Sequence, residues 1–189
     1  NEINEEMYRK ITDNRQVDEK EARDTAKVVA LSAIKYGDLS NQASKDYIFD
    51  MDKFTSFEGN TGPYILYTIV RIKSILNKVK EQEGLGTEEL CKAGELLRNV
   101  GSEAEKSLML SLSGFKAMKE TAYVDTAPHK VCAYIYELAN AFNRFYHETK
   151  IVTEENQEKK NSYLALLLLT RDVLETCIDV LGFSAPERM

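Results

Sequence analysis

The stretch Ser56-Phe57-Glu58-Gly59-Asn60-Thr61-Gly62-Pro63-Tyr64 joins a glycine-rich turn to the start of a helix. Glycine and proline clustered in this way mark a turn. Thr61 is a residue type that caps helices at their N-terminus, and Pro63 is tolerated in a first helical turn. The pattern therefore predicts a helix from residue 61 to about Glu83, where two glycines follow.

The predicted helix has two faces that point in different directions, because successive helical residues advance by about 100°. One face is aliphatic and is expected to pack into the core: Ile65, Ile69, Ile72, Leu76 and Val79. The other face is aromatic and cationic: Tyr64, Tyr67, Arg71, Ser74 and Lys78. We expect this second face to point toward solvent or a partner.

The aromatic and cationic face has two interpretations. Phenol rings and a guanidinium plane can stack on bases exposed in a single-stranded RNA loop, at about 1–3 kcal/mol per base. Arginine can also hold a phosphate through two hydrogen bonds. In the alternative, the tyrosines are half-buried packing residues and Arg71 caps a neighbouring carbonyl. Spacing alone leaves both interpretations open.

The residues before this turn predict less regular structure. Residues 1–16 are polar and read as a short helix or the remnant of a preceding domain. A helix is predicted from Asp18 to about Gly37, because apolar residues recur at steps of three and four after a capping pattern. Residues 46–52 alternate charged and apolar side chains, which indicates a short strand or an extended connector.

The residues after Gly84 alternate helical patterns with short polar connections. Further helices are predicted to start at Thr87 and near Ser102, the latter leading into the apolar segment 108–118. Residues 126–128 cap another helix that runs to about Lys150. A last long helix is predicted to end at Gly182, because glycine commonly follows a helix C-terminus.

This succession of helices predicts an all-α fold, an antiparallel helix bundle with sequential helices packed against each other. The expected boundary lies just before the long helix: residues 1–60 form a connector, and residues 61–189 form the bundle.

The helix predicted from residue 126 also has an inner and an outer face. Its core stripe is Val131, Tyr134, Leu138, Phe142 and Phe145. Its other side carries Asn140, Asn143 and His147, with Tyr136 beside them and Tyr146 at the flank. Tyr146 either extends the stacking surface or is a boundary tyrosine that buries its ring and exposes its hydroxyl.

The composition excludes several classes of function. A net charge of −6 argues against a protein that covers duplex phosphates with Lys and Arg, but not against local stacking on RNA. The three cysteines are an odd number, spaced far apart, and indicate neither a disulfide framework nor a zinc site, which fits a reducing cytoplasm. The longest apolar run, 163–169, is far too short to span a bilayer.

The chain shows no pattern of an active site. Neither a nucleophile elbow, a P-loop, a glycine-rich dinucleotide turn nor paired carboxylates occur in it, and His129 and His147 are too far apart for one metal motif. The chain begins with Asn1 rather than Met, which suggests that it is cut from a longer protein.

The residues resemble one known family. The segments Asp46-Tyr47-Ile48-Phe49-Asp50-Met51-Asp52-Lys53 and 56–64, with Tyr67 and Arg71-Ile72, are similar to arginyl-tRNA synthetases where the catalytic domain passes into the helical anticodon-binding domain. The tail Leu181-Gly182-Phe183-Ser184-Ala185-Pro186-Glu187-Arg188-Met189 resembles the extreme C-terminus of that family, and residues 141–146 resemble its central helix.

The resemblance implies an anticodon-binding module of a class I enzyme that joins arginine to its tRNA with ATP and magnesium. It implies that the anticodon loop meets five positions: Tyr64, Tyr67, Arg71, Tyr146 and Met189. The HIGH-type and KMSK-type signatures that bind ATP are absent from the sequence, so we expect this piece to hold no cofactor and not to aminoacylate.

The implied partners are the arginine tRNA and the catalytic domain of the same protein, in a cytoplasmic monomer without membrane contact. The chain departs from the family where relatives often have a glutamine, and then a small residue and a histidine, before the arginine. It has these residues instead: Leu66, Thr68, Ile69 and Val70. Two alternatives stay open, the anticodon-binding domain of a cysteinyl-type synthetase and a helical scaffold that binds protein.

Overall fold

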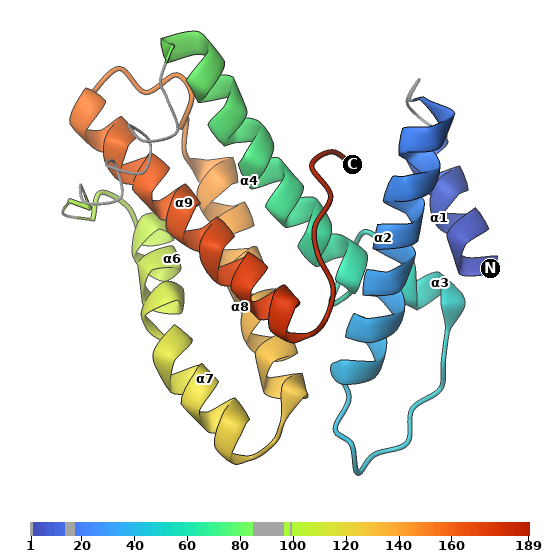
Figure 1. The fold of residues 1–189 in the computed structure, drawn as a ribbon. Coiled ribbons are helices and arrows are strands. Elements are labelled where there is room, and N and C mark those ends of the chain that lie inside the picture. The colour runs from blue at the N-terminus through green and yellow to red at the C-terminus, as the bar shows by residue number, and fades with distance from the viewer. Residues whose placement is uncertain (1, 14–17, 85–96, 99) are drawn as a thin grey trace.

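The computed structural model describes residues 2–13, 18–84, 97–98 and 100–189 (Figure 1). Within these ranges every regular element is a helix: α1 (Glu2–Thr12), α2 (Glu19–Leu39), α3 (Met51–Phe54), α4 (Gly62–Glu83), α6 (Glu103–Ser113), α7 (Phe115–Val124), α8 (Pro128–Glu148) and α9 (Gln157–Val180). The predicted all-α fold is confirmed. The helix start predicted at Thr87 lies outside the described residues.

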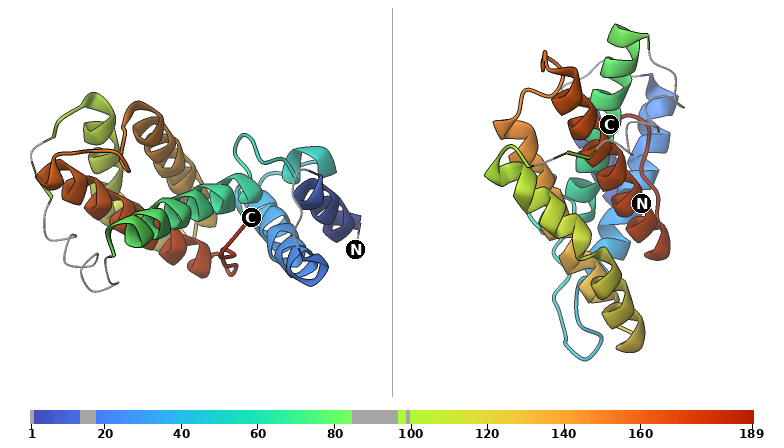
Figure 2. Two further views of the ribbon diagram at one scale, coloured as in Figure 1. Left: turned by 90° about the horizontal axis from the view of Figure 1, so that it is seen from above. Right: turned by 90° about the vertical axis from the view of Figure 1, so that its left-hand side faces the viewer.

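The centre of the fold is formed by α4, α8 and α9, each of which contacts the other two. α9 runs in the opposite direction to α4 and α8 (Figure 1). α6 packs on α8 and α9, and α7 continues from α6 along α8. α2 packs against α4, and α1 packs against α2 and lies farther from α4, as the left view of Figure 2 shows. No helix in the described ranges combines the length and the apolar character that a membrane span requires.

The turn at residues 56–64 produces α4 as its sequence predicts. The Thr61 hydroxyl accepts a hydrogen bond from the backbone N–H of Tyr64 at 3.2 Å, and Gly84 ends the helix in the left-handed conformation. The predicted aliphatic face is buried: Ile65, Ile69, Ile72, Leu76 and Val79. A Cβ added at Gly62 would lie 2.3 Å from the carbonyl oxygen of Ser32, so glycine permits the close approach of α2 to α4.

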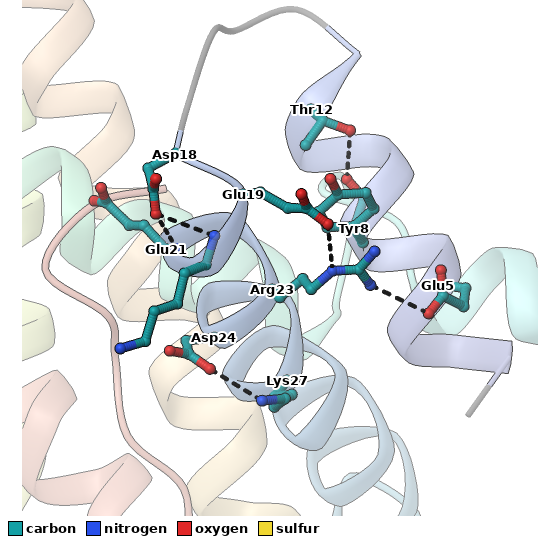
Figure 3. Close-up of polar contacts among 10 residues, drawn as sticks. Glu5, Tyr8, Thr12, Asp18, Glu19, Glu21, Arg23, Asp24 and Lys27 are labelled. Atoms are coloured by element: carbon teal, nitrogen blue, oxygen red, sulfur yellow. Dashed lines mark hydrogen bonds and ion pairs between the residues drawn. The ribbon is translucent and has the colours of Figure 1, made fainter.

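Both apolar and charged contacts join α1 to α2, and Figure 3 shows the charged ones, around Arg23. Met7 of α1 is fully buried. The guanidinium carbon of Arg23 lies 4.5 Å from the centre of the Tyr8 ring, and Arg23 also forms an ion pair with Glu5 at 3.6 Å. The Asp18 carboxylate caps α2 by accepting backbone hydrogen bonds, as its sequence pattern predicts.

Some predicted boundaries are wrong. The strand alternative for residues 46–52 fails, because residues 46–50 form no strand and α3 begins at Met51. The predicted helix start at residues 126–128 is confirmed: Ala127 is the N-cap of α8, although it makes no side-chain hydrogen bond, and Pro128 is the first helical residue. The apolar segment 108–118 is divided at Gly114 into α6 and α7.

Candidate nucleic-acid interface

A polar cleft of about 820 Å³ lies between α4, the last turns of α8 and the end of the chain. Four of the five residues that the family resemblance implies line it: Tyr67, Arg71, Tyr146 and Met189. They come from three segments that are far apart in the sequence. The volume lies within the range of about 300–1,000 Å³ that is common for ligand pockets.

Arg71 is the centre of this cleft. Its guanidinium carbon lies 4.7 Å from the centre of the Tyr67 ring and 5.2 Å from that of the Tyr146 ring. Tyr67 precedes it by one helical turn on α4, and Tyr146 reaches it from α8. A cation held near two aromatic rings is attracted by their negative faces. The result is a surface of planar groups, of which Tyr67 is 38% exposed.

The side-chain amide of Asn143 on α8 holds Arg71 in place through hydrogen bonds. Its Oδ1 accepts a hydrogen bond from Nη1 of Arg71 at 2.5 Å. Its Nδ2 donates to the Tyr64 hydroxyl at 2.9 Å and to Oγ1 of Thr68 at 3.2 Å. The amide thus uses both of its N–H groups and its oxygen across the α4–α8 interface. This network fixes the direction in which Arg71 points.

Tyr64, the fifth implied residue, does not line the cleft. It is half-buried, its hydroxyl donates to Oδ1 of Asn140 at 2.8 Å, and its ring lies edge-on to Tyr136 at 5.9 Å. Burial raises its pKa, although the hydrogen bond from Asn143 acts in the opposite direction. Tyr64 thus supports the wall of the cleft from inside.

The four positions that depart from the family pattern lie in the interior. Leu66, Thr68 and Ile69 are fully buried, and Val70 is 9% exposed. Thr68 donates its hydroxyl proton to the carbonyl of Tyr64 at 3.0 Å and accepts from Asn143. Of these four residues, only Val70 borders the cleft.

The charges of the cleft are mixed. Arg71, Lys78 and Arg188 border it, together with Glu81 and Glu187. Neither Lys78 nor Arg188 forms a salt bridge with a side chain in the described parts of the chain, although Glu187 is bound by a lysine outside the cleft. Cations without a protein partner can bind phosphate, which is the contact that positions nucleic acids.

Sequence reasoning missed the residues that support this cleft. Asn140 and Asn143 were placed on the outer side of α8 without a role, and their spacing of three residues was the available signal. The contact of each with Tyr64 joins residues more than 70 positions apart, which local patterns do not reveal. The two histidines are not brought together, since His147 stands beside Tyr146 and His129 is in the first turn of α8.

The rest of the described structure contains an apolar groove and two buried thiols. A groove of about 480 Å³ between α7, α8 and α9 has an almost wholly apolar lining that includes Phe115, Met118 and Tyr123. In the residues that the structure describes, no three His, Cys, Asp or Glu side chains are grouped so that they would hold a metal ion. Burial raises the pKa of the Cys132 and Cys177 thiols to about 12, which makes them poor nucleophiles.

Comparison with known proteins shows which family the chain belongs to. The model of the DALR anticodon binding domain matches residues 65–189, which include every residue of the cleft. Two similar proteins are named arginine--tRNA ligase. That of Agathobacter rectalis is 60% identical over 100% of this chain and 32% of its own length, and that of Alkaliphilus oremlandii is 50% identical over 99% and 31%.

Solved structures agree with the sequence relatives. The chain superposes on arginyl-tRNA synthetase from Plasmodium falciparum with a TM-score of 0.81 and 29% identity, over 100% of this chain and 32% of that one. For the enzyme from Thermus thermophilus the TM-score is 0.78 and the identity 27%, with the same coverage. The chain thus spans about a third of the length of these relatives, and the predicted resemblance is confirmed.

Proposed function

The chain belongs to the family of DALR anticodon-binding domains, and from this premise we propose that it is the tRNA anticodon-binding module of an arginyl-tRNA synthetase. The curated relatives named above are arginine--tRNA ligases, which favours this assignment over the cysteinyl-type alternative. The bases of the anticodon loop are the proposed ligands of the cleft between α4, α8 and the C-terminal tail.

The observation that carries this proposal is the position of Arg71 between two tyrosine rings. The guanidinium of Arg71 lies over the rings of Tyr67 and Tyr146, all three side chains line the cleft, and Tyr67 is 38% exposed there. Bases splayed out of a single-stranded loop stack on such planes. Met189 adds a polarizable thioether that packs well against aromatic rings.

The charge of the chain fits recognition of a loop better than recognition of a duplex. A net charge of −6 repels a phosphate backbone that approaches broadly. Lys78 and Arg188 supply local positive charge at the cleft itself. We therefore expect a contact that is confined to a few nucleotides and has a shallow dependence on salt.

The full-length protein is proposed to join arginine to its tRNA with ATP, in the cytoplasm and as a monomer. No described group of side chains in this chain fits magnesium, and the sequence lacks the HIGH-type and KMSK-type signatures. ATP and magnesium are therefore assigned to the part of the relatives that this chain does not span. The chain's own residues would bind and orient the tRNA.

A titration of matched variants tests the proposal. Tyr67→Ala is expected to weaken binding of a hairpin RNA that carries the anticodon arm of an arginine tRNA by about tenfold, the equivalent of one lost stacking contact. Tyr123→Ala is the control, because Tyr123 is 85% exposed and lies on α7 at the apolar groove. Equal affinity of the two variants would refute the cleft as the binding site.

A further inference from the structure

The cationic face of α4 continues along the cleft beyond Arg71. Ser74 and Lys78 follow Arg71 on this helix, both are exposed, and both line the cleft. Residues one heptad apart point in directions that differ by only about 20° in an α-helix. Because α4 is one continuous helix (Figure 1), Lys78 lies on the same side as Arg71 and about 10 Å farther along the helix axis.

The two cations of α4 in the cleft have different surroundings. The guanidinium of Arg71 donates a hydrogen bond to Asn143 and lies over two tyrosine rings. Lys78 takes part in no hydrogen bond or ion pair in the described parts of the chain, although Glu81 follows it at a spacing that often forms one. Arg71 is thus engaged with the protein, whereas the donors of Lys78 face solvent.

The acidic side chains of the cleft do not cancel this charge. Oε1 of Glu187 lies 2.7 Å from Nζ of Lys73, whose side chain is only 13% exposed and does not line the cleft. Glu187 is therefore paired with a cation outside the cleft, and Glu81 is the other acidic side chain that borders it. The lining side chains are thus locally positive, although the chain as a whole carries a net charge of −6.

A lysine at this position suits a phosphate better than a base. An ammonium group is a compact point charge without a planar face, so it attracts phosphate but does not stack. Phosphate contacts position a nucleic acid and carry no sequence information. A separation of about 10 Å corresponds to about three steps of a stacked strand at about 3.4 Å each. When a base stacks beside Arg71, the backbone of the same short loop passes within reach of Lys78.

We propose that Lys78 binds a backbone phosphate of the anticodon loop. It contributes affinity that is independent of the anticodon sequence, while the surface formed by Arg71 and the tyrosine rings contacts the bases. This inference rests on the proposed function of the cleft, and it adds a second subsite with a different chemistry.

The dependence of affinity on salt separates the two subsites. Lys78→Gln is expected to weaken binding of the anticodon-arm hairpin by about threefold at low salt. It should also make the slope of log affinity against log salt shallower by about 0.7, the contribution of one phosphate contact in a single strand. Tyr67→Ala weakens binding without changing this slope. Lys116→Gln is the control for net charge, because Lys116 is 83% exposed on α7 and does not line the cleft.

A set of chemically modified hairpins identifies the phosphate. In each hairpin one loop phosphate is replaced by an uncharged methylphosphonate. For the wild type, replacement at one position is expected to weaken binding as much as Lys78→Gln does. The same replacement should have almost no further effect in Lys78→Gln, because a pair that is already broken cannot be lost again. Lys78→Arg should retain the wild-type response, since arginine also binds phosphate.

The outcomes separate this inference from the proposed function. Wild-type protein that does not bind the unmodified hairpin contradicts the proposed function, and this inference fails with it. If the wild type binds but Lys78→Gln has the affinity and salt slope of Lys116→Gln, only the phosphate contact is refuted. It is also refuted if every methylphosphonate weakens Lys78→Gln as much as it weakens the wild type.

Discussion

Nη1 of Arg71 lies 2.5 Å from Oδ1 of Asn143, and this hydrogen bond joins the cationic group of the cleft to a network that spans α4 and α8. The same amide donates to Tyr64 and Thr68. Arg71 is therefore held by a hydrogen bond, and its guanidinium also lies over the rings of Tyr67 and Tyr146. An arginine fixed in this way loses less conformational entropy when a ligand binds.

Asn143→Ala tests this network. Removing the amide takes one hydrogen-bond partner from the half-buried Arg71 and Tyr64 and from the fully buried Thr68, so the free energy of unfolding should fall by about 1–3 kcal/mol. The affinity for the anticodon-arm hairpin should also fall several-fold, because Arg71 is no longer oriented. Asn140→Ala is the control, since Asn140 bonds only the Tyr64 hydroxyl in the described network. Equal losses of RNA affinity in both variants would argue against a special role for Asn143.

Tyr64→Phe separates support from direct contact. The hydroxyl of Tyr64 donates to Asn140 and accepts from Asn143, so its removal should lower the free energy of unfolding by about 1–2 kcal/mol in denaturant titrations. RNA affinity should change less than in Tyr67→Ala, because Tyr64 lies behind the cleft wall. A larger loss of RNA affinity in Tyr64→Phe than in Tyr67→Ala would show that Tyr64 meets the RNA directly.

The sequence predicted the element that forms the cleft because the signals for α4 are local. A threonine cap, a proline in the first turn and an aliphatic stripe each act within a few residues, and all three are observed. The same reasoning separated Tyr67 and Arg71 from the core face. The start of α8 at residues 126–128 was predicted in the same way, although the cap residue Ala127 makes no side-chain hydrogen bond.

The position of Tyr64 could not be predicted in this way. Spacing places Tyr64 on the same side of α4 as Tyr67, and only the packing of α8 across the first turns of α4 removes it from the surface. The contact of Lys73 with the tail has the same character, since it joins residues 114 positions apart. Such pairs depend on how the helices assemble.

Gly62→Ala tests the junction between α2 and α4. The added methyl would lie 2.3 Å from the carbonyl oxygen of Ser32, so the helices must move apart, and we expect a loss of about 1–3 kcal/mol in the free energy of unfolding. Gly101→Ala is a suitable control, because its Cβ would meet only Oε2 of Glu105 at 3.2 Å, a milder approach than at Gly62. Thermal denaturation followed by circular dichroism compares the two, and a Gly62→Ala protein as stable as the control would contradict this close packing.

Tyr36 makes the stability dependent on alkaline pH. Its hydroxyl is fully buried and lies 2.9 Å from the carbonyl oxygen of Cys132, and burial raises its pKa far above the ordinary value of 10.0. The unfolded chain therefore loses this proton above pH 10 while the folded chain keeps it. The stabilising contribution is complete below pH 10, and it falls above pH 10 by up to about 1.4 kcal/mol per pH unit.

Tyr36→Phe should remove this part of the pH dependence. Denaturant titrations between pH 8 and pH 11.5 are expected to show a shallower fall in stability for the variant than for the wild type, by up to about 1.4 kcal/mol per pH unit above pH 10. Tyr123→Phe, at an 85% exposed position, should leave the wild-type slope unchanged. Parallel curves for the wild type and Tyr36→Phe would mean that Tyr36 titrates normally.

The most direct test of the central claim is the affinity of the wild-type protein for two transcripts that differ only in the anticodon. One is an arginine tRNA, and the other carries the anticodon of a different amino acid in the same body. If the cleft around Arg71 binds the anticodon loop, the arginine tRNA should bind at least about tenfold more tightly, equivalent to about 1.4 kcal/mol. Equal affinity for the two transcripts would contradict the assignment of this cleft as the anticodon site.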